Sequence, residues 1–281
     1  MPESSMGAAE RLRAFRAGYP EKTLAVSGTE WKYRICGGGE RALLTPPGGE
    51  LVNDLAFDLA TALAASFRVV YPAYPRLKSL DEISDGLAAI LDAENIPRVS
   101  VLGASFGGAV AQCMVRRYPA RIDRLILSNT GVPLANLVRS VKIANAIPAA
   151  MPWPLLRRLL AAATVKLLHG AGAERGFWRN YANQLFARQL TKPDIMANLR
   201  IQLDYHRCYR FAPADLDGWM RNWSGKVFII ESDNDVLSAA RRKALRDTYP
   251  QATLYTFHGA GHAPAFTRPD EYLGVVQRFL K

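Results

Sequence analysis

The segment from Val99 to Gly108 constrains the fold of this chain more than any other stretch. An apolar run, Val99-Ser-Val-Leu102, leads directly into Gly103-Ala-Ser105-Phe-Gly107, and a helix-like pattern begins at once. A serine in so sharp a turn adopts a strained backbone, and glycines two positions before and after it avoid the collisions that side chains would cause there. A Gly-x-Ser-x-Gly pattern between a strand and a helix is typical of a nucleophile elbow. Ser105 is therefore a candidate nucleophile.

Short apolar runs alternate with helical patterns on both sides of this segment. After a polar leader, strands are expected at 24–26, 32–36, 42–45, 67–71, 98–102, 124–128, 226–231 and 253–257. Helices are expected at 53–66, 79–94, 109–118, 241–249 and 270–280, the second of which begins with a capping box, Ser79-Leu-Asp-Glu82. This alternation predicts an α/β fold with a mostly parallel, doubly wound sheet and helices on both of its faces.

The strand rhythm stops between the sixth and seventh expected strands. Residues 131–223 contain amphipathic helical segments, such as 155–168 and 177–190, broken by prolines, and no clear strand. Because a loop of about 90 residues is uncommon in a compact domain, this block is interpreted as an inserted helical unit. We expect a core of residues 1–131 and 224–281, and a helical cap of residues 132–223 that covers the active edge of the sheet as a lid.

The composition limits the compartment and the partners of the chain. Hydrophobic residues make up 49% of the 281 residues and charged ones 22%, and no apolar run reaches the roughly 18 residues of a membrane span. The net charge of +11 comes from dispersed groups such as Arg157-Arg158, without a nucleic-acid motif. The first ten residues lack a secretory pattern, and the three cysteines lack metal-ligand spacing. We expect a cytoplasmic protein with a small-molecule substrate, no nucleic-acid partner, no cofactor and no metal.

A serine nucleophile needs a base and an orienting acid, in the chain order Ser, Asp or Glu, His. His262 lies in the Gly-rich loop after the last expected strand and is the preferred base, with His258 as the alternative. Asp235 and Asp233 both follow the seventh expected strand, and we favour Asp235, with Asp233 as the alternative acid. All these candidates follow carboxyl ends of strands, which is the edge where such sheets carry their sites.

An oxyanion formed during acyl transfer needs two hydrogen-bond donors. The backbone N–H of Phe106 supplies one, and the loop Pro46-Pro-Gly-Gly49 after the third expected strand is the source of the second. Prolines have no N–H, so that donor is expected at Gly48, Gly49 or a close follower, unless the loop is simply a tight turn. Tyr205 and His206 of the insert are candidates for lining a substrate pocket, although ordinary packing would also explain them.

Residues 40–130 and 226–281 resemble the α/β-hydrolase superfamily. The resemblance rests on the elbow, on the segment Tyr118-Pro-Ala-Arg-Ile-Asp-Arg-Leu-Ile-Leu127 and on the Gly-His262 loop. In that family the acid stands three residues beyond a position usually occupied by glycine, here Ser232, and this alignment implies Asp235. Within the superfamily the chain is similar to maspardin-like proteins, which share the Pro-Pro pair, the Gly-Ala-Ser elbow and a Tyr-Pro pair, here Tyr71-Pro72 or Tyr74-Pro75.

The sequence departs from the common hydrolase pattern at two places. Pro46-Pro47 replaces the usual His-Gly, and no Gly-His-Gly-x-Ser segment follows the fourth strand. Maspardin itself is more similar to a binding protein with an incomplete triad, whereas this chain keeps Ser105, Asp235 and His262. We therefore expect a serine hydrolase that cleaves an ester, thioester or related acyl bond of a small, partly apolar substrate. The alternatives are a lyase or cyclase that uses the same serine and histidine for acid–base chemistry, and a catalytically weak binding protein.

Overall fold

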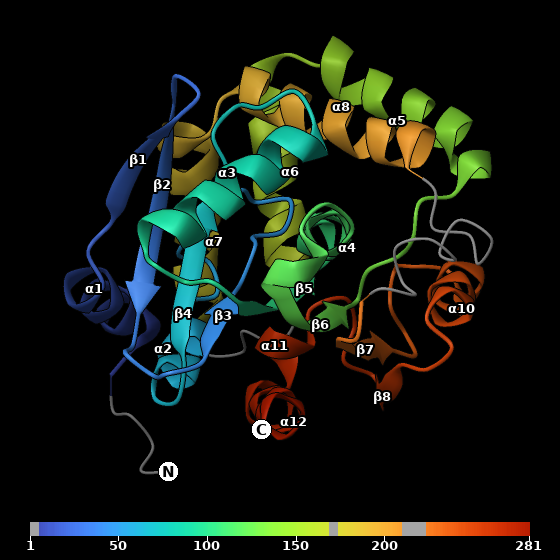
Figure 1. Ribbon diagram of the computed structural model, residues 1–281. Coiled ribbons are helices and arrows are strands. Elements are labelled where there is room, and N and C mark those ends of the chain that lie inside the picture. Colours follow the sequence, from blue (N-terminus) through green and yellow to red (C-terminus); the bar gives the residue numbers. More distant parts are fainter. Residues whose placement is uncertain (1–5, 169–173, 210–222) are drawn as a thin grey trace.

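The computed structural model describes residues 6–168, 174–209 and 223–281 (Figure 1). Within them, the strands are β1 Lys22–Val26, β2 Thr29–Cys36, β3 Ala42–Leu44, β4 Arg68–Ala73, β5 Val99–Ala104, β6 Ile122–Ser128, β7 Lys226–Ser232 and β8 Thr253–Phe257. The α-helices are α1 Ala8–Gly18, α2 Phe57–Ala64, α3 Leu80–Ala93, α4 Phe106–Arg117, α5 Val138–Ala150, α6 Trp153–Leu167, α7 Arg175–Gln184, α8 Lys192–Cys208, α10 Ala239–Thr248, α11 Pro264–Thr267 and α12 Pro269–Leu280. Shorter turns of helix occur at η1 Pro119–Arg121, η2 Ala135–Leu137 and η4 Leu185–Gln189.

The strands form one sheet in the order β1-β2-β4-β3-β5-β6-β7-β8. β1 and β2 form an antiparallel hairpin, β2 is also antiparallel to β4, and all the remaining pairs are parallel. Central strand residues such as Leu43, Val69, Val101 and Leu125 are completely buried, as expected for strands that are covered on both faces. The predicted α/β fold, with its mostly parallel sheet, is confirmed.

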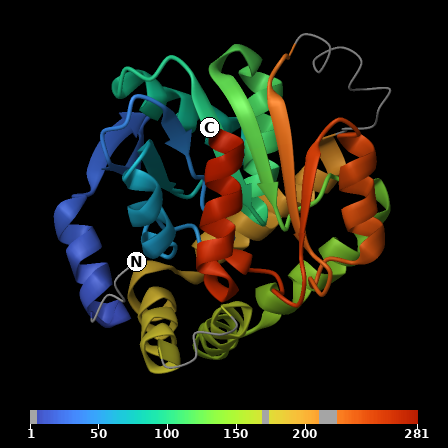
Figure 2. The same ribbon diagram turned by 90° about the horizontal axis from the view of Figure 1, so that it is seen from below.

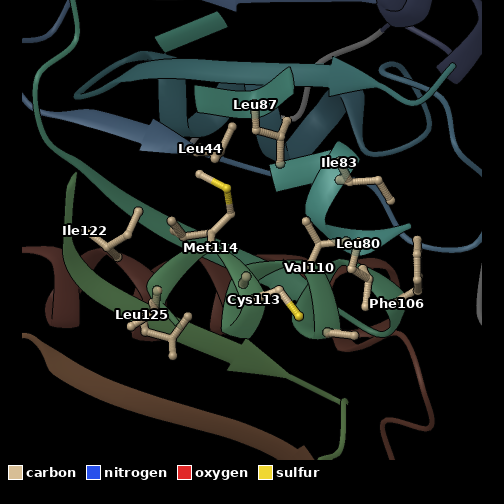
Figure 3. Close-up of a cluster of buried hydrophobic side chains, with 14 of the residues drawn as sticks. Leu44, Leu80, Ile83, Leu87, Phe106, Val110, Cys113, Met114, Ile122 and Leu125 are labelled. Atoms are coloured by element: carbon tan, nitrogen blue, oxygen red, sulfur yellow. The ribbon is translucent and has the colours of Figure 1, made fainter. Parts of the chain in front are cut away.

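Helices cover both faces of the sheet and create two apolar cores. One core packs α3, α4 and α10 on the sheet. Figure 3 shows part of it, with Leu87 of α3 near Val110 and Met114 of α4. The other contains α1, α2 and α12, and α12 lies beside α2 (Figure 2). Burial of a leucine or valine side chain contributes about 1.5–3 kcal/mol, so these two cores fix the strand ends firmly in place.

The helix α3 begins as its sequence predicts. The Ser79 hydroxyl accepts a hydrogen bond from the Glu82 N–H at 3.1 Å, which satisfies a donor that the first turn leaves without a partner. The Glu82 carboxylate accepts the N–H of Lys78 at 2.7 Å, one residue before the position that the capping box expects. The cap is therefore present in a slightly altered form.

The helix α1 lies in the segment interpreted from the sequence as a polar leader. Ala8, Leu12 and Phe15 follow one another at spacings of four and three and bury one stripe of this helix against α2. On its outer side, Arg11 forms ion pairs with Asp58 and Glu174, both at 2.9 Å. Two large apolar residues, Leu12 and Phe15, among four charged ones give a weak sequence signal, and only these distant partners make the stripe an interface.

The helices α5 to α8 lie between β6 and β7, inside the segment 132–223 that the sequence assigns to a cap. Parts of that segment, 169–173 and 210–222, lie outside the described residues. Figure 1 shows α5 beside α8, and α6 packs on α7. Pro148 does not break the chain here but sits within α5. Among the described residues, no helix combines the length and apolarity needed to cross a bilayer.

Helix propensity predicts that alanine in place of a helical glycine stabilises the protein, but packing predicts the opposite at Gly86 in α3. A Cβ at Gly86 would lie 2.0 Å from the buried Trp31 ring, whereas one at Gly274 in α12 would meet only the end of the Arg278 side chain at 3.4 Å. Gly274→Ala should therefore raise the free energy of unfolding by up to about 1 kcal/mol, and Gly86→Ala should lower it by about 1–3 kcal/mol. Urea denaturation of both variants measures this, and stabilisation by Gly86→Ala would contradict the packing of β2 on α3.

Candidate active site

Ser105 stands on the sharp turn between β5 and α4 that the sequence predicts. Its backbone has φ 52° and ψ −121°, a conformation that costs a non-glycine residue about 1–3 kcal/mol. A Cβ at Gly103 would lie 2.3 Å from the Gly107 carbonyl oxygen, and one at Gly107 would lie 2.3 Å from the Pro46 carbonyl oxygen. Both glycines are thus required by close backbone contacts, and the second contact also joins the elbow to the Pro46 loop.

Backbone contacts with β6 hold the strained serine in place. The N–H of Ser105 donates to the Ser128 carbonyl at 3.0 Å, which extends the pairing of β5 with β6 by one bond. The Thr130 hydroxyl donates to the Ser105 carbonyl at 2.7 Å. The turn is therefore fixed on both sides of the serine, and its hydroxyl is presented beyond the end of the strand.

The side chains of Ser105, His262 and Asp235 form a continuous hydrogen-bonded row. His262 Nε2 lies 3.0 Å from Ser105 Oγ, and His262 Nδ1 lies 2.7 Å from Asp235 Oδ1. An ionised carboxylate only accepts hydrogen bonds, so it favours the proton on Nδ1 and leaves Nε2 of the neutral ring able to accept from the serine. The row thus has the arrangement of a nucleophile, a base and an orienting acid.

Asp235 is held by donors on both carboxylate oxygens. Besides His262, the Leu237 N–H donates to Oδ1 at 3.0 Å and Asn129 Nδ2 donates to Oδ2 at 2.8 Å. Burial raises the pKa of Asp235, but these hydrogen bonds and the nearby His262 outweigh it, so the pKa lies below its usual range. The side chain is fully buried and stays ionised at neutral pH.

Asn129 is a site residue that the sequence reasoning missed. It follows β6 directly with a left-handed φ of 45°, and its side chain also donates to Ser232 Oγ at 3.2 Å and to the Gly261 carbonyl at 3.3 Å. It therefore ties the acid loop to the histidine loop. Its place at the carboxyl end of a strand is the same signal that selected Asp235.

Asp233 and His258, the alternative acid and base, form a separate pair. Asp233 Oδ2 lies 2.9 Å from His258 Nδ1, and Asp233 Oδ1 accepts the N–H of Gly259 at 2.9 Å. Both side chains are exposed, at 47% and 86% respectively. Asp233 therefore braces the last loop, and no hydrogen bond joins it to His262 in the described structure.

The candidate oxyanion loop differs between its two glycines. The N–H of Gly48 donates to Glu50 Oε1 at 3.0 Å, whereas Gly49 lines the same cavity as Ser105 and Phe106. Burial raises the pKa of Glu50, partly opposed by the backbone N–H groups of Glu50 and Gly48 and by the nearby His262. Phe106 is the first residue of α4, so its N–H has no partner within the helix.

Ser105 opens into a cavity of about 230 Å³. Its walls come from α4, from the loops after β6 and β7, and from α8, which contributes Tyr205 and His206. The Tyr205 hydroxyl donates to the Gly131 carbonyl at 3.0 Å, so its oxygen is engaged in structure while its ring faces the cavity. Both pocket candidates from the insert thus border the same space as the serine. Arg241 of α10, which the sequence reasoning did not single out, borders it as well.

His206 is held neutral in this wall. Its Nδ1 accepts the Leu134 N–H at 3.0 Å, which places the ring proton on Nε2. Burial, together with the positive charge of Arg241, lowers the pKa of His206 from 6.5 to about 4. The imidazole is therefore uncharged at neutral pH.

A sequence model of the Alpha/beta hydrolase family matches residues 24–275. The chain belongs to the alpha/beta hydrolase family. This α/β-hydrolase is 24% identical over 274 residues to an uncharacterized protein of Mycobacterium tuberculosis, a match that covers 91% of this chain and 79% of the relative. It is also 23% identical over 191 residues to a pimeloyl-acyl-carrier-protein methyl ester esterase of Nitrosospira multiformis, covering 66% of this chain and 69% of the esterase.

Solved structures of hydrolases share the fold of this α/β-hydrolase. A hydrolase from Pseudomonas aeruginosa PA01 has a TM-score of 0.75 at 21% identity, covering 93% of this chain and 98% of that one. An enol-lactonase from Burkholderia xenovorans LB400 has a TM-score of 0.72 at 18% identity, covering 92% and 99%. These findings confirm the resemblance to the superfamily and support an enzyme of hydrolase type. The finer resemblance to maspardin-like proteins stays a prediction.

The neutral state of His206 predicts a loss of stability in acid. The unfolded chain binds a proton near the ordinary pKa of 6.5 and the folded protein only near 4, so acidification below 6.5 favours unfolding. Between pH 7 and pH 5 this residue should reduce the free energy of unfolding by roughly 1 to 2 kcal/mol. Urea denaturation of His206→Gln, whose amide oxygen can still accept the Leu134 N–H, should show a shallower pH dependence by that amount. Equal slopes for the variant and the wild type would contradict a neutral, buried His206.

Proposed function

We propose that this α/β-hydrolase is a serine hydrolase that cleaves an ester, thioester or related acyl bond. The observation that carries the proposal is the row of hydrogen bonds from Ser105 Oγ to His262 Nε2, at 3.0 Å, and from His262 Nδ1 to Asp235 Oδ1, at 2.7 Å. A serine hydroxyl is a poor nucleophile without an adjacent base, and this row supplies one. Family membership and the hydrolase fold of its neighbours agree with this activity.

The geometry supports a two-step reaction through an acyl-enzyme. His262 Nε2 takes the proton of Ser105 as Oγ attacks the acyl carbon, and it then returns that proton to the departing alcohol or thiol. Water next attacks the acyl-serine bond, His262 takes one proton from it, and the proton returns to Ser105 as the acid product leaves. Asp235, fixed by Asn129 and by the Leu237 N–H, keeps the imidazole in its tautomer and stabilises its positive form.

The oxyanion formed in each step needs donors beside Ser105. We assign the N–H of Phe106, at the positive end of α4, as one of them. For the second, the proposal favours Gly49 over Gly48, because the N–H of Gly48 donates to Glu50 in this structure and Gly49 lines the cavity. Gly107, pressed against Pro46, holds this loop beside the elbow.

The inserted helices serve as the lid of this site in the proposal. Tyr205 and His206 of α8 form part of the wall that faces Ser105, and Asn198 of the same helix donates to the Gly49 carbonyl at 3.4 Å. The segment 132–223 would thus act as a cap on a core of residues 1–131 and 224–281. A cavity of about 230 Å³ with Phe106 and Leu237 among its walls suits a small, partly apolar acyl group.

A fluorophosphonate probe tests the nucleophile directly. The wild-type protein should form a one-to-one covalent adduct on Ser105, seen by intact-protein mass spectrometry, and Ser105→Ala should form none. Ester turnover by Ser105→Ala should fall by roughly a million-fold in kcat, because the attacking atom is lost. Absence of labelling in the folded wild-type protein would refute the proposal and favour a binding protein. Substantial turnover in Ser105→Ala would favour acid–base chemistry of a lyase or cyclase.

The two aspartates after β7 form a matched pair of variants. Asp235→Asn should lower kcat by about 10⁴-fold, because the amide favours the wrong histidine tautomer. Asp233→Asn removes the same charge two residues away, where the side chain contacts His258 and Gly259 and lies outside the Ser105–His262–Asp235 row, so kcat should stay within about three-fold of wild type. Steady-state kinetics on a p-nitrophenyl ester measures both. If Asp233→Asn had the larger effect, the acid would be wrongly assigned.

A further inference from the structure

Arg241 places a positive charge in the wall of the Ser105 cavity. It is the third residue of α10, on the face of the sheet that also carries α4, and it borders the cavity together with Ser105 and His262. Its guanidinium approaches Gly131, where an added Cβ would lie 3.8 Å from both Nε and Nη2. Among the described residues that line this cavity, Arg241 is the sole Lys or Arg, and none is Asp or Glu.

This guanidinium lacks an acceptor within the described part of the chain. Its Nε is buried without a hydrogen-bond partner, and no carboxylate lies within ion-pair distance of it in residues 6–168, 174–209 and 223–281. Asp235 is the carboxylate whose charge acts on Arg241, but its oxygens already accept hydrogen bonds from His262, Asn129 and Leu237. Burial lowers the pKa of Arg241, but a guanidinium stays charged at any physiological pH.

Two other arginines with limited exposure are paired. Arg246 donates to both oxygens of Glu231 at 2.7 Å, and the buried Arg34 donates to the Tyr19 carbonyl at 2.5 Å and lies 3.7 Å from the Glu21 carboxylate. Removing a cation from water without a counter-charge is costly, and folded proteins rarely keep such a group. An unpaired guanidinium that faces a cavity instead of solid packing is therefore explained by a partner that arrives from outside.

The titratable groups of α8 near Arg241 are uncharged, so Arg241 provides the permanent charge of the cavity wall. His206 is neutral, because burial and Arg241 itself lower its pKa to about 4. Tyr205 is kept in its neutral form, since burial raises its pKa well above the usual value. An anion that enters the cavity thus meets one permanent positive charge and no permanent negative charge among the lining residues.

We propose that the substrate of this enzyme carries a second, anionic group, a carboxylate or a phosphate, which pairs with Arg241 while the acyl bond lies at Ser105. This inference rests on the proposed hydrolase function and adds a substrate class to it. A guanidinium binds such an anion by two parallel hydrogen bonds, which fixes orientation as well as adding affinity. Ser105 and Arg241 line the same cavity of about 230 Å³, so a short acyl chain between the two groups suits it.

Two p-nitrophenyl esters of equal chain length test the proposal kinetically. The mono-ester of glutaric acid carries a free carboxylate at its far end, and the pentanoate ester does not. Arg241→Gln should lower kcat/KM for the glutarate ester by about ten- to a hundred-fold, the loss expected for a charge-assisted pair, and change the pentanoate value by less than about three-fold. Arg241→Lys should recover part of the loss. Lys243→Gln removes the same charge from the exposed side of α10, where Lys243 pairs with Asp247, and should leave both substrates unchanged.

Equal losses on both esters would overturn the inference while leaving the serine hydrolase intact, since Arg241 would then support the fold or the triad. Thermal unfolding of Arg241→Gln identifies a folding defect. If there is one, the kcat/KM values of Arg241→Lys for the two esters are compared with those of the wild type instead.

A binding arm does not depend on turnover. Calorimetry with Ser105→Ala should detect monomethyl glutarate or inorganic phosphate, and Ser105→Ala combined with Arg241→Gln should lose that binding by at least about ten-fold. Preference for one of the two probes identifies the anion as a carboxylate or a phosphate. Binding of neither probe, or equal binding by both variants, would refute an anion site at Arg241. A failed fluorophosphonate reaction with retained Arg241-dependent binding would instead refute the hydrolase function alone.

Discussion

The parallel pairing of β5, β6, β7 and β8 is the constraint on which the site depends. Ala104 pairs with Ser128 and Ser128 with Ile230, and β7 and β8 end two residues further on, where Ser232 pairs with Phe257, so all four strands end at the same edge of the sheet. Each loop that leaves this edge carries one group of the proposed machinery. Parallel register therefore brings together residues that are up to 157 positions apart, such as Ser105 and His262, without any long-range adjustment by the loops themselves.

The same pairing also stabilises a strained residue. The left-handed backbone of Ser105 is unfavourable for a residue with a side chain, and the bonds to Ser128 and from Thr130 offset that cost. Asn129, between these two residues, turns its side chain to the acid loop and the histidine loop. The last residue of β6 and the two residues after it thus hold the nucleophile on one side and its acid on the other.

The sequence predicts the fold and the members of the row because both follow from short-range patterns. Alternating strands and helices define the sheet, and the elbow and the Gly-rich His262 loop stand at strand ends. Contacts between segments that are distant in the chain leave no local pattern in the sequence. The stripe of α1 is an interface only beside α2, the N–H of Gly48 is engaged only because Glu50 folds back on it, and the pairing of Asp233 with His258 depends on side-chain direction in two loops. Arg241 is one of many arginines until the absence of an acceptor in the described structure distinguishes it.

Three titratable residues around the cavity avoid the cost of a buried charge in different ways. The difference distinguishes residues that support the site from one that can bind a ligand. Asp235 is a buried anion, and both of its oxygens accept hydrogen bonds from the protein. These bonds offset the cost of desolvation without any ligand. His206 avoids the cost by staying neutral, with Nδ1 bound to the Leu134 N–H. Arg241 can neither lose its proton nor find an acceptor among the described residues, so its charge is directed at whatever fills the cavity. A substrate with an anionic end would complete this set, and a wholly neutral one would leave the guanidinium desolvated each time the cavity fills.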